Sequence, residues 1–262
     1  MDKLRVSSFA KGAVHNAAAE QGIYAAEELE IELDVTQSSK VQLQQLIDGE
    51  WELIHTNADN VVWWCEDNGA DLLIVAATDG KPSQDLVVRP EIKSYEDLRG
   101  KIIAVDAAES GYVTPLRVLL KEAGLNERDD YTFVEFGATQ GRVDAMQRGE
   151  AFAGMISEGR DLGDKGLWVM DTINRLYTHY AGTIAMRRDW AAANEELAVR
   201  YLRAQIRATV AVRGEGWTPS FAWEGLTAMI QTRADVGWLR GAVDPRRFAD
   251  QSLFDKAVAS LE

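Results

Sequence analysis

The sequence contains one cysteine, Cys65, and three histidines, His15, His55 and His179. A single thiol excludes an internal disulfide, and it is compatible both with the cytoplasm and with an exported protein whose signal has been removed. The histidines are widely spaced and show none of the short intervals that mark a metal-binding pair. We therefore expect no metal site. The cysteine content leaves the cellular compartment of the protein undecided.

Cofactor motifs are also missing. The chain has no phosphate-binding loop, no dinucleotide glycine fingerprint and no nucleophile elbow. Each of these motifs supplies the backbone N–H groups or the strained nucleophile that its chemistry requires. The sequence thus predicts no cofactor and carries no short catalytic signature.

Positive charge is scarce, because 28 Lys and Arg residues stand against 42 Asp and Glu, for a formal net charge of −14. Such a charge disfavours nucleic acid and anionic membrane surfaces as partners. No apolar run approaches the ~18 residues that suggest a membrane-spanning helix, so we expect no transmembrane segment. The N-terminus lacks an apolar targeting segment, since Lys3–Ser8 has the pattern of a strand.

The first part of the chain alternates between strand and helix patterns. Glu30–Val35 shows the charged–apolar alternation of a half-buried strand, and Asp71–Thr78 is an almost continuous apolar strand. Further strands are expected at Leu4–Ser8 and Glu52–Thr56, with helices at Gly12–Gln21, from Ser38 or Ser39 to Ile47, and at about Asn57–Asn68. Repeated strand–helix units predict a mainly parallel sheet with helices on its faces.

A second strand–helix series follows the break at Lys81-Pro82-Ser83. Its strands are expected at Asp85–Arg89, Lys101–Asp106, Tyr131–Phe136 and Ala151–Ser157, its helices at Tyr112–Ala123 and Gln140–Gln147, and a capped turn at Ser94–Asp97. The chain then continues with strands at Leu167–Met170 and Tyr180–Met186, a helix at Glu195–Arg213, and helical residues from Ser220 to Glu262. We therefore predict two lobes, made of residues 1–83 plus 184–262 and of residues 84–183.

Three stretches carry a family resemblance, namely Ala17–Tyr24 with the strand after it, Asp48–Ile54, and Ile92–Val105. They resemble the periplasmic substrate-binding proteins of the type II fold, in the branch of the sulfonate and taurine binders and the thiamine-precursor (NMT1/THI5-like) proteins. The resemblance implies an α/β fold with two lobes, mainly parallel sheets and a hinge-bounded cleft that closes on one small molecule. It also implies an ABC-transporter permease as a partner.

The chain departs from that family in two respects. It shows no export signal or lipobox, which puts transport in question. It also lacks the cysteine-rich iron motif of the thiamine-precursor synthases, which argues against their chemistry. A native start at Met1 would indicate a cytoplasmic protein, and a removed signal would indicate a periplasmic or other extracytoplasmic one.

The predicted ligand site follows from the strand ends. Ligands of open α/β sheets bind beyond the carboxyl ends of the strands, where helix N-termini present free N–H groups. Together with a histidine of the first helix and a tyrosine of the returning strand, these ends predict the ligand-binding residues Phe9, His15, His55, Asn57, Asp59, Asn60, Asp79, Asp106, Ser110, Gly111, Tyr112, Ser157, Glu158 and Tyr180.

Each of these positions has more than one interpretation. His55 ends an apolar strand, where an imidazole can contact a ligand oxygen, serve an acid–base step or cap a helix. The Asn and Asp residues of 57–60 are ligand contacts or N-caps. Ser110-Gly111 precedes a helix and forms either an anion cradle or a plain cap, since Gly permits close backbone approach.

Three carboxylates are expected at the same mouth, those of Asp79, Asp106 and Glu158. They suit a ligand with an amine or ring N–H, and their proximity can raise one carboxyl pKa enough for proton transfer. A cap or a hinge salt bridge explains each of them separately.

Two functions follow from these observations. The leading one is non-enzymatic capture of one small polar organic molecule between the lobes, as an ABC-transporter substrate-binding protein does. The alternative is a cytoplasmic enzyme on the same fold, of the decarboxylase or lyase type, with His55, Asp106 and Glu158 as acid–base candidates on a small organic acid. The residues leave both functions open, along with a cytoplasmic ligand sensor that would need its own partner.

Overall fold

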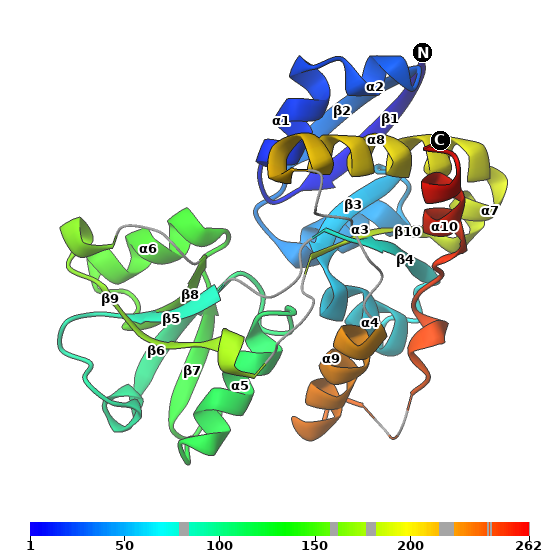
Figure 1. The fold of residues 1–262 in the computed structure, drawn as a ribbon. Helices are drawn as coiled ribbons and strands as arrows, with labels where there is room; N and C mark the ends of the chain where they lie inside the picture. The colour runs from blue at the N-terminus through cyan, green and yellow to red at the C-terminus, as the bar shows by residue number, and fades with distance from the viewer. Residues whose placement is uncertain are drawn as a thin grey trace.

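A computed structural model describes residues 1–78, 84–157, 162–176, 182–214, 223–239, 241 and 243–261. It shows two five-stranded sheets, each covered by helices, and confirms the expected two-lobed α/β fold (Figure 1). The predicted site residues Asp79, Glu158 and Tyr180, like His179, lie outside the described residues.

The first sheet has the strand order β2-β1-β3-β10-β4. These strands are β1 (Asp2–Ser8), β2 (Leu29–Val35), β3 (Leu53–Asn57), β4 (Leu72–Ala77) and β10 (Gly182–Arg187). Strand β1 pairs in parallel with β2 and β3, whereas β10 pairs antiparallel with both β3 and β4. Four strands therefore share one direction, and only β10 opposes them.

The second sheet repeats this plan with the order β7-β6-β8-β5-β9. Its strands are β5 (Gln84–Val88), β6 (Lys101–Val105), β7 (Tyr131–Glu135), β8 (Ala153–Ser157) and β9 (Trp168–Thr172). Here β5 is the strand that opposes the other four. In hydrogen-bond pattern both sheets are mixed, because each opposing strand lies between two neighbours and makes two antiparallel ladders.

Helices cover both faces of the first sheet. The helices α1 (Ala13–Glu20), α2 (Ile23–Ala26), α8 (Glu195–Arg213) and α10 (Ser252–Ala259) contribute to one apolar cluster, and α3 (Ser39–Ile47), α4 (Ala58–Asp67) and α9 (Trp223–Asp235) to the other. Strand β4 shows why it is apolar throughout: Leu73 and Val75 enter the first cluster, while Leu72 and Ile74 enter the second. A strand buried on both faces loses the usual alternation.

The second sheet is covered by α5 (Val113–Glu122) and α6 (Thr139–Arg148), which pack into separate apolar clusters. The expected capped turn is the 3-10 turn Tyr95–Leu98, which begins with a capping box between Ser94 and Asp97. Further short elements are the 3-10 turns Gly163–Lys165, Ile173–Arg175 and Pro245–Arg247, and helix α7 (Arg188–Ala193).

The expected helical stretch at the C-terminal end is interrupted between α9 and α10, where the described residues include the 3-10 turn Pro245–Arg247 and a bridge to β4. Between α9 and α10, Ala249 forms a parallel bridge with Ile74 of β4. The Ile74 N–H donates to the Phe248 carbonyl at 2.8 Å, and the Asp250 N–H donates to the Ile74 carbonyl at 3.0 Å. This segment pairs with the outer edge of β4. The division into residues 1–83 plus 184–262 and residues 84–183 stays a prediction. For comparison with its boundary at 183/184, strand β10 of the first sheet begins at Gly182.

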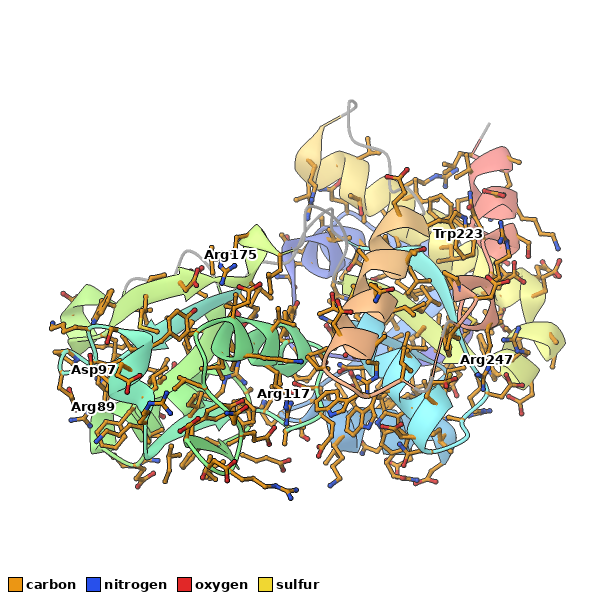
Figure 2. The ribbon with its side chains drawn as sticks, turned by 90° about the horizontal axis from the view of Figure 1, so that it is seen from below. Arg89, Asp97, Arg117, Arg175, Trp223 and Arg247 are labelled. Atoms are coloured by element: carbon orange, nitrogen blue, oxygen red, sulfur yellow. The ribbon has the colours of Figure 1, made fainter. Side chains whose placement is uncertain are left out.

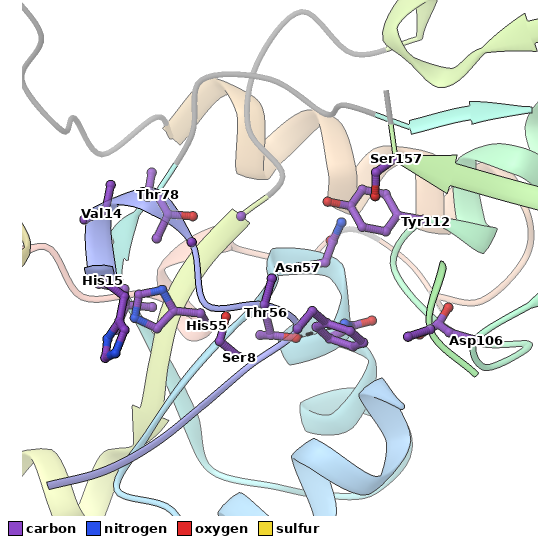
Figure 3. Close-up of a pocket in the computed structure, with 18 of the residues that line it drawn as sticks. Ser8, Val14, His15, His55, Thr56, Asn57, Thr78, Asp106, Tyr112 and Ser157 are labelled. Atoms are coloured by element: carbon purple, nitrogen blue, oxygen red, sulfur yellow. Dashed lines mark hydrogen bonds between the residues drawn. The ribbon is translucent and has the colours of Figure 1, made fainter. Parts of the chain in front are cut away.

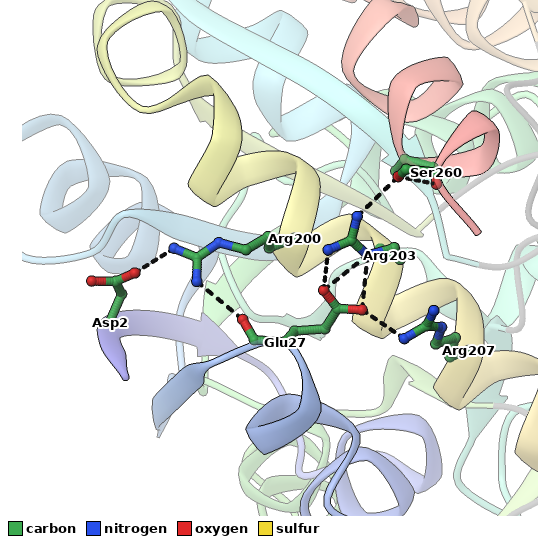
Figure 4. Close-up of polar contacts among 7 residues, drawn as sticks. Asp2, Glu27, Arg200, Arg203, Arg207 and Ser260 are labelled. Carbon is green, nitrogen blue, oxygen red and sulfur yellow. Dashed lines mark hydrogen bonds and ion pairs between the residues drawn. The ribbon is translucent and has the colours of Figure 1, made fainter. Parts of the chain in front are cut away.

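One ion cluster fastens α8 to the rest of the first lobe (Figure 4). Glu27, only 3% exposed, follows α2 and accepts hydrogen bonds from the guanidinium groups of Arg203 and Arg207, with N···O distances of 2.8 Å. Arg200 donates to the Glu27 carbonyl at 3.1 Å, and Arg203 also reaches Ser260. Successive turns of α8 are thereby tied to one buried carboxylate.

Candidate functional site

A cavity of about 570 Å³ lies between the two sheets and is lined from both (Figure 3). From the first sheet, Ser8, Thr56 and Thr78 reach it at the ends of β1, β3 and β4. From the second sheet, Asp106 and Ser157 reach it at the ends of β6 and β8. The cavity thus lies where the carboxyl ends of strands from both sheets face each other, as the topology rule for such sheets requires.

The predicted site residues divide into three groups. Asp59 and Gly111 lie outside the cavity lining, and Asp79, Glu158 and Tyr180 are not described. The others line the cavity: Phe9, His15, His55, Asn57, Asn60, Asp106, Ser110, Tyr112 and Ser157. In Figure 3, His15 and His55 lie at one end of this group, and Asp106, Tyr112 and Ser157 at the other.

Asp59 forms a buried contact between helices instead. One of its carboxylate oxygens accepts hydrogen bonds from the Thr114 hydroxyl at 2.7 Å and from Arg233 at 2.8 Å. The side chains of Asp59 and Arg233 are 2% and 0% exposed. Burial raises the pKa of Asp59, and the Arg233 charge opposes this rise. Asp59 therefore joins α4, α5 and α9 and lies outside the cavity lining.

Gly111 brings the N-termini of α4 and α5 together. Its N–H donates to Asn60 Oδ1 at 2.6 Å, and a Cβ at this position would lie 2.3 Å from Asn57 Oδ1. Asn57 cannot easily move away, because the same oxygen caps α4 by accepting from the Asp59 N–H at 2.8 Å. The predicted anion cradle at Ser110-Gly111 therefore gives its glycine N–H to the opposite lobe.

The lobes also meet at Asp106 and along α5. The Asp106 carboxylate accepts hydrogen bonds from the hydroxyls of Ser39, in the first lobe, at 2.7 Å and of Ser110 at 2.6 Å. Arg117 of α5, labelled in Figure 2, stacks over Trp238, which follows α9, at 4.1 Å from the ring centre. Together with the Asp59 and Gly111 contacts, these interactions hold the two lobes against each other.

His55 is bonded within the first lobe. Its Nε2 lies 2.7 Å from the Tyr201 hydroxyl of α8. Burial lowers the pKa of His55 to about 4, with a smaller contribution from His15, so the imidazole is neutral at pH 7. His55 and Asp106 share no hydrogen bond in the described structure.

Arg142 is a site residue that the sequence did not reveal. It is 6% exposed, lines the cavity, and donates to the carbonyls of Met155 at 2.7 Å and Gly137 at 2.6 Å and to the Thr139 hydroxyl at 3.2 Å. It is the fourth residue of α6, and an arginine in an amphipathic helix normally indicates a solvated helix face. Ala138, Thr139 and Gln140 at the start of the same helix also line the cavity, and Ala138 supplies no side-chain cap.

Gln84 was also missed, because it directly follows the break at 81–83. Its amide nitrogen donates to the Ser157 hydroxyl at 3.2 Å. Its side-chain amide oxygen, Oε1, is buried and has no hydrogen-bond partner among the described residues, although the side chain lines the cavity. A buried acceptor without a partner is costly unless a ligand supplies the donor.

The described ranges contain no group of three histidine, cysteine, aspartate or glutamate side chains placed to hold a metal ion. Their helices include none that is long and apolar enough to cross a membrane. Cys65 is buried, and burial raises the pKa of its thiol to about 11, which leaves it protonated.

Comparison with protein families identifies the chain's relatives. The sequence model of the family described as "ABC transporter, phosphonate, periplasmic substrate-binding protein" matches residues 23–176. The chain belongs to this family. Its members are substrate-binding components of ABC transporters, so a small-molecule ligand and a permease partner follow from membership. No curated protein matches the sequence closely enough to count as a relative.

Solved structures agree on the fold. A protein from Bordetella bronchiseptica RB50 has a TM-score of 0.82 and 17% identity, with 99% of this chain and 98% of that chain covered. The periplasmic nitrate-binding protein NrtA from Synechocystis PCC 6803 has a TM-score of 0.78 and 14% identity, with coverage of 99% and 89%. The alkanesulfonate-binding protein SsuA from Xanthomonas axonopodis pv. citri, bound to MOPS, has a TM-score of 0.69 and 19% identity, with coverage of 98% and 83%.

Family and fold together confirm the resemblance to type II periplasmic substrate-binding proteins. They also confirm the leading function, binding of a small molecule as an ABC-transporter substrate-binding protein. The thiamine-precursor part of the resemblance stays a prediction, as do the roles of the individual site residues.

Proposed function

We propose that this chain captures one small organic anion in the cavity between its lobes and delivers it to the permease of an ABC transporter. The observation that carries the proposal is Arg142, a buried guanidinium in the cavity wall beside the uncapped start of α6. The nitrate and alkanesulfonate binders of similar fold, by their names, take ligands of this charge.

The start of α6 suits an anion for two reasons. The first N–H groups of a helix have no partner within the helix, and the helix dipole favours negative charge there. The guanidinium adds a full positive charge in a water-poor place, where a charge-assisted hydrogen bond is strong. The formal charge of −14 belongs to the whole chain and does not decide this local field.

Gln84 refines the expected ligand. Its carbonyl oxygen needs a donor, so the ligand should carry an O–H or N–H near its anionic group. A singly protonated phosphonate has such an O–H, and a sulfonate needs an added amine or hydroxyl to match it. We therefore expect phosphonates to bind more tightly than sulfonates with the same substituent.

Contacts between the lobes support enclosure of the ligand. Ser39 with Asp106, and Asn60 with Gly111, join the lobes by hydrogen bonds between residues that line or adjoin the cavity. An anion held between these contacts is shielded from water, which strengthens its hydrogen bonds. The closed arrangement also gives the permease one defined surface to recognise.

Isothermal titration calorimetry on the full chain tests the proposal with methyl-substituted phosphonate, sulfonate and carboxylate, nitrate, and neutral and cationic compounds of matched size. We expect an anion to bind and to stabilise the fold, by about 2.7 kcal/mol at a hundredfold excess over Kd. Replacing Arg142 by Gln should weaken binding about 10- to 100-fold, since hydrogen bonds to charged groups contribute about 1.5–3 kcal/mol.

Two variants control for folding and for charge. Arg142→Lys keeps the charge without the planar fork and should retain part of the affinity. Arg148→Gln, on the same helix with its side chain 55% exposed, should leave Kd unchanged. Binding of only neutral or cationic compounds would refute anion capture, as would full affinity in a folded Arg142→Gln protein.

A further inference from the structure

The cavity does not end between the lobes but continues into the first lobe, between its sheet and α8. We call this part the inner compartment and define it by Tyr24, His55, Tyr201, Leu202, Ile206 and Phe254. All of these except His55 belong to the apolar cluster that forms the core on this face of the sheet. The lining of the inner compartment is therefore shared with the core.

Protein cores are normally filled, because open space among apolar side chains forfeits packing contacts. An opening into the core that connects with a ligand cleft is therefore best explained as room for part of the ligand. The whole cavity, about 570 Å³, falls among pockets that hold organic molecules, which span about 300–1,000 Å³. A bare oxyanion at α6 would leave most of this space unused.

The inner compartment is apolar but contains a set of neutral hydrogen-bonding groups. His55 bonds Tyr201, and the Tyr24 hydroxyl lies 3.1 Å from His15 Nδ1 and accepts from the Gln205 amide at 2.8 Å. His55 Nδ1 and His15 Nε2 have no hydrogen-bond partner among the described residues. Both histidines line the cavity, and each keeps one ring nitrogen for a ligand.

Aromatic rings give this compartment flat walls. The rings of Tyr24 and Tyr201 are stacked, with centres 6.3 Å apart and planes inclined by 7°. His55 meets Tyr201 edge-on, with centres 6.2 Å apart. Such surfaces favour a planar ring, which can stack or pack edge-to-face, over a flexible alkyl chain.

Formal charge is confined to the other end of the cavity. In the described lining, only Asp106 and Arg142 carry a permanent charge, and both come from the second lobe. Burial lowers the pKa of His55 to about 4, and burial together with Lys11 lowers the pKa of His15. Among the described residues, the inner compartment therefore offers no counter-charge to a charged group.

We propose that the ligand carries, beside its anionic group, an uncharged planar ring with at least one hydrogen-bonding atom, and that this ring enters the inner compartment. This inference rests on the proposed anion capture, which places the charged group at Arg142. The substrate class is thus a small heteroaromatic or phenol-like organic anion. The paired imidazole and hydroxyl groups, His55 with Tyr201 and His15 with Tyr24, serve a ring nitrogen or hydroxyl equally well, because both kinds of group can donate or accept.

The test measures Kd by calorimetry on the full chain for methyl, propyl and pyridin-3-ylmethyl substituents, each as phosphonate and as sulfonate. With the better head group, we expect the pyridylmethyl compound to bind about tenfold or more tightly than the methyl compound, and more tightly than the propyl compound. Equal affinity for methyl and pyridylmethyl overturns the inference and leaves anion capture intact. Equal affinity for the propyl and pyridylmethyl compounds contradicts the claim that the inner compartment prefers a planar ring to an alkyl chain.

Failure of every phosphonate and sulfonate to bind has a different meaning, because it refutes anion capture at these head groups and the inference with it. The two proposals are therefore distinguishable in one set of titrations.

A substitution in the inner compartment tests whether the ligand's ring binds there. Leu202→Trp fills the inner compartment, so the ratio of the methyl to the pyridylmethyl Kd, about ten or more in the unmodified chain, should fall below about two. Val212→Trp, on the same helix but 41% exposed, is the matched control and should keep the ratio. If Leu202→Trp fails to fold, His55→Phe provides the second test, since it removes the hydrogen-bonding ring nitrogens. An unchanged ratio in a folded Leu202→Trp or His55→Phe protein overturns the inference.

Discussion

His55 combines exposure to the cavity with an environment that keeps it uncharged. It follows the buried residues Leu53 and Ile54 of β3, and the Tyr201 hydroxyl bonds its Nε2. Protonation would place a cation beside the apolar core of the first lobe, where no carboxylate of the described residues is in hydrogen-bond contact with it. Burial therefore lowers the pKa of His55. The free energy of unfolding consequently depends on pH through this residue.

The sign of that linkage predicts lower stability in mild acid. Above pH 6.5 neither the folded nor the unfolded chain protonates His55, whereas between 6.5 and about 4 only the unfolded chain does. Its contribution to stability is complete above pH 6.5 and is lost as the pH falls toward 4. Urea unfolding at pH 7 and pH 5 should show a loss about 1–2 kcal/mol larger for the unmodified chain than for His55→Gln. Equal losses would contradict this origin.

Some residues of the site could be predicted, and others could not, for physical reasons. Strand ends placed His55 and Asp106 correctly at the cavity, because chain direction alone brings them there. Among residues 57–60, the N-cap role that the sequence offered belongs to Asn57, whose oxygen accepts from Asp59 within the same helix. The side chains of Asp59 and Asn60 turn to Arg233 and Gly111. Their directions depend on α9 and on the start of α5, which lie far away in sequence.

Helices supply two of the missed residues, whereas Gln84 comes from β5. Tyr201 reaches the cavity from α8, and Arg142 from the second turn of α6. Their sequence patterns indicate ordinary amphipathic helices, and nothing local marks a buried polar residue. The bounds of α8 were predicted as observed, while the role of its inner face depended on the packing of α1, α2 and α10 around it.

At the scale of elements, the start of α6 depends on Gly141. A Cβ there would lie 2.1 Å from the Phe136 carbonyl oxygen, which belongs to the backbone and cannot rotate away. Helix propensity alone favours alanine over glycine by about 1 kcal/mol in a helix interior. The clash outweighs this preference, because it forces the first turn of α6 away from the end of β7.

We therefore expect Gly141→Ala to destabilise the chain and to weaken ligand binding by displacing the start of α6. Thermal unfolding and calorimetry measure the two effects. Gln147→Ala, an exposed position on the same helix, serves as control and should change stability by no more than about 0.5 kcal/mol. Stabilisation by Gly141→Ala would show that the start of α6 adapts and that the close approach is unimportant.

At the scale of the whole molecule, the two lobes meet through contacts that tolerate little extra volume. Gly111 lies against Asn57 so closely that even one methyl group does not fit, and Asn57 is held by its capping role. Glycine is required at position 111 because Asn57 of the neighbouring lobe leaves no room for a side chain, and not because of its backbone angles.

Gly111→Ala should accordingly favour separated lobes. We expect about a tenfold loss of ligand affinity, because closure must then be driven by the ligand. Small-angle scattering should show a larger radius of gyration for the ligand-free variant than for the unmodified chain. An unchanged radius together with unchanged affinity would mean that the α4 and α5 ends separate without consequence for the cleft.

The position of β10 has a consequence for how the chain is made. This strand lies between β3 and β4 in the first sheet, yet β4 ends at Ala77 and β10 begins at Gly182. During synthesis, the edges of β3 and β4 that pair with β10 therefore stay unpaired until β10 has been made. By then every strand of the second sheet, from Gln84 to Thr172, has already left the ribosome. The middle of this chain can complete its sheet before the beginning does, and the last-made strand of the first sheet is the one that closes it.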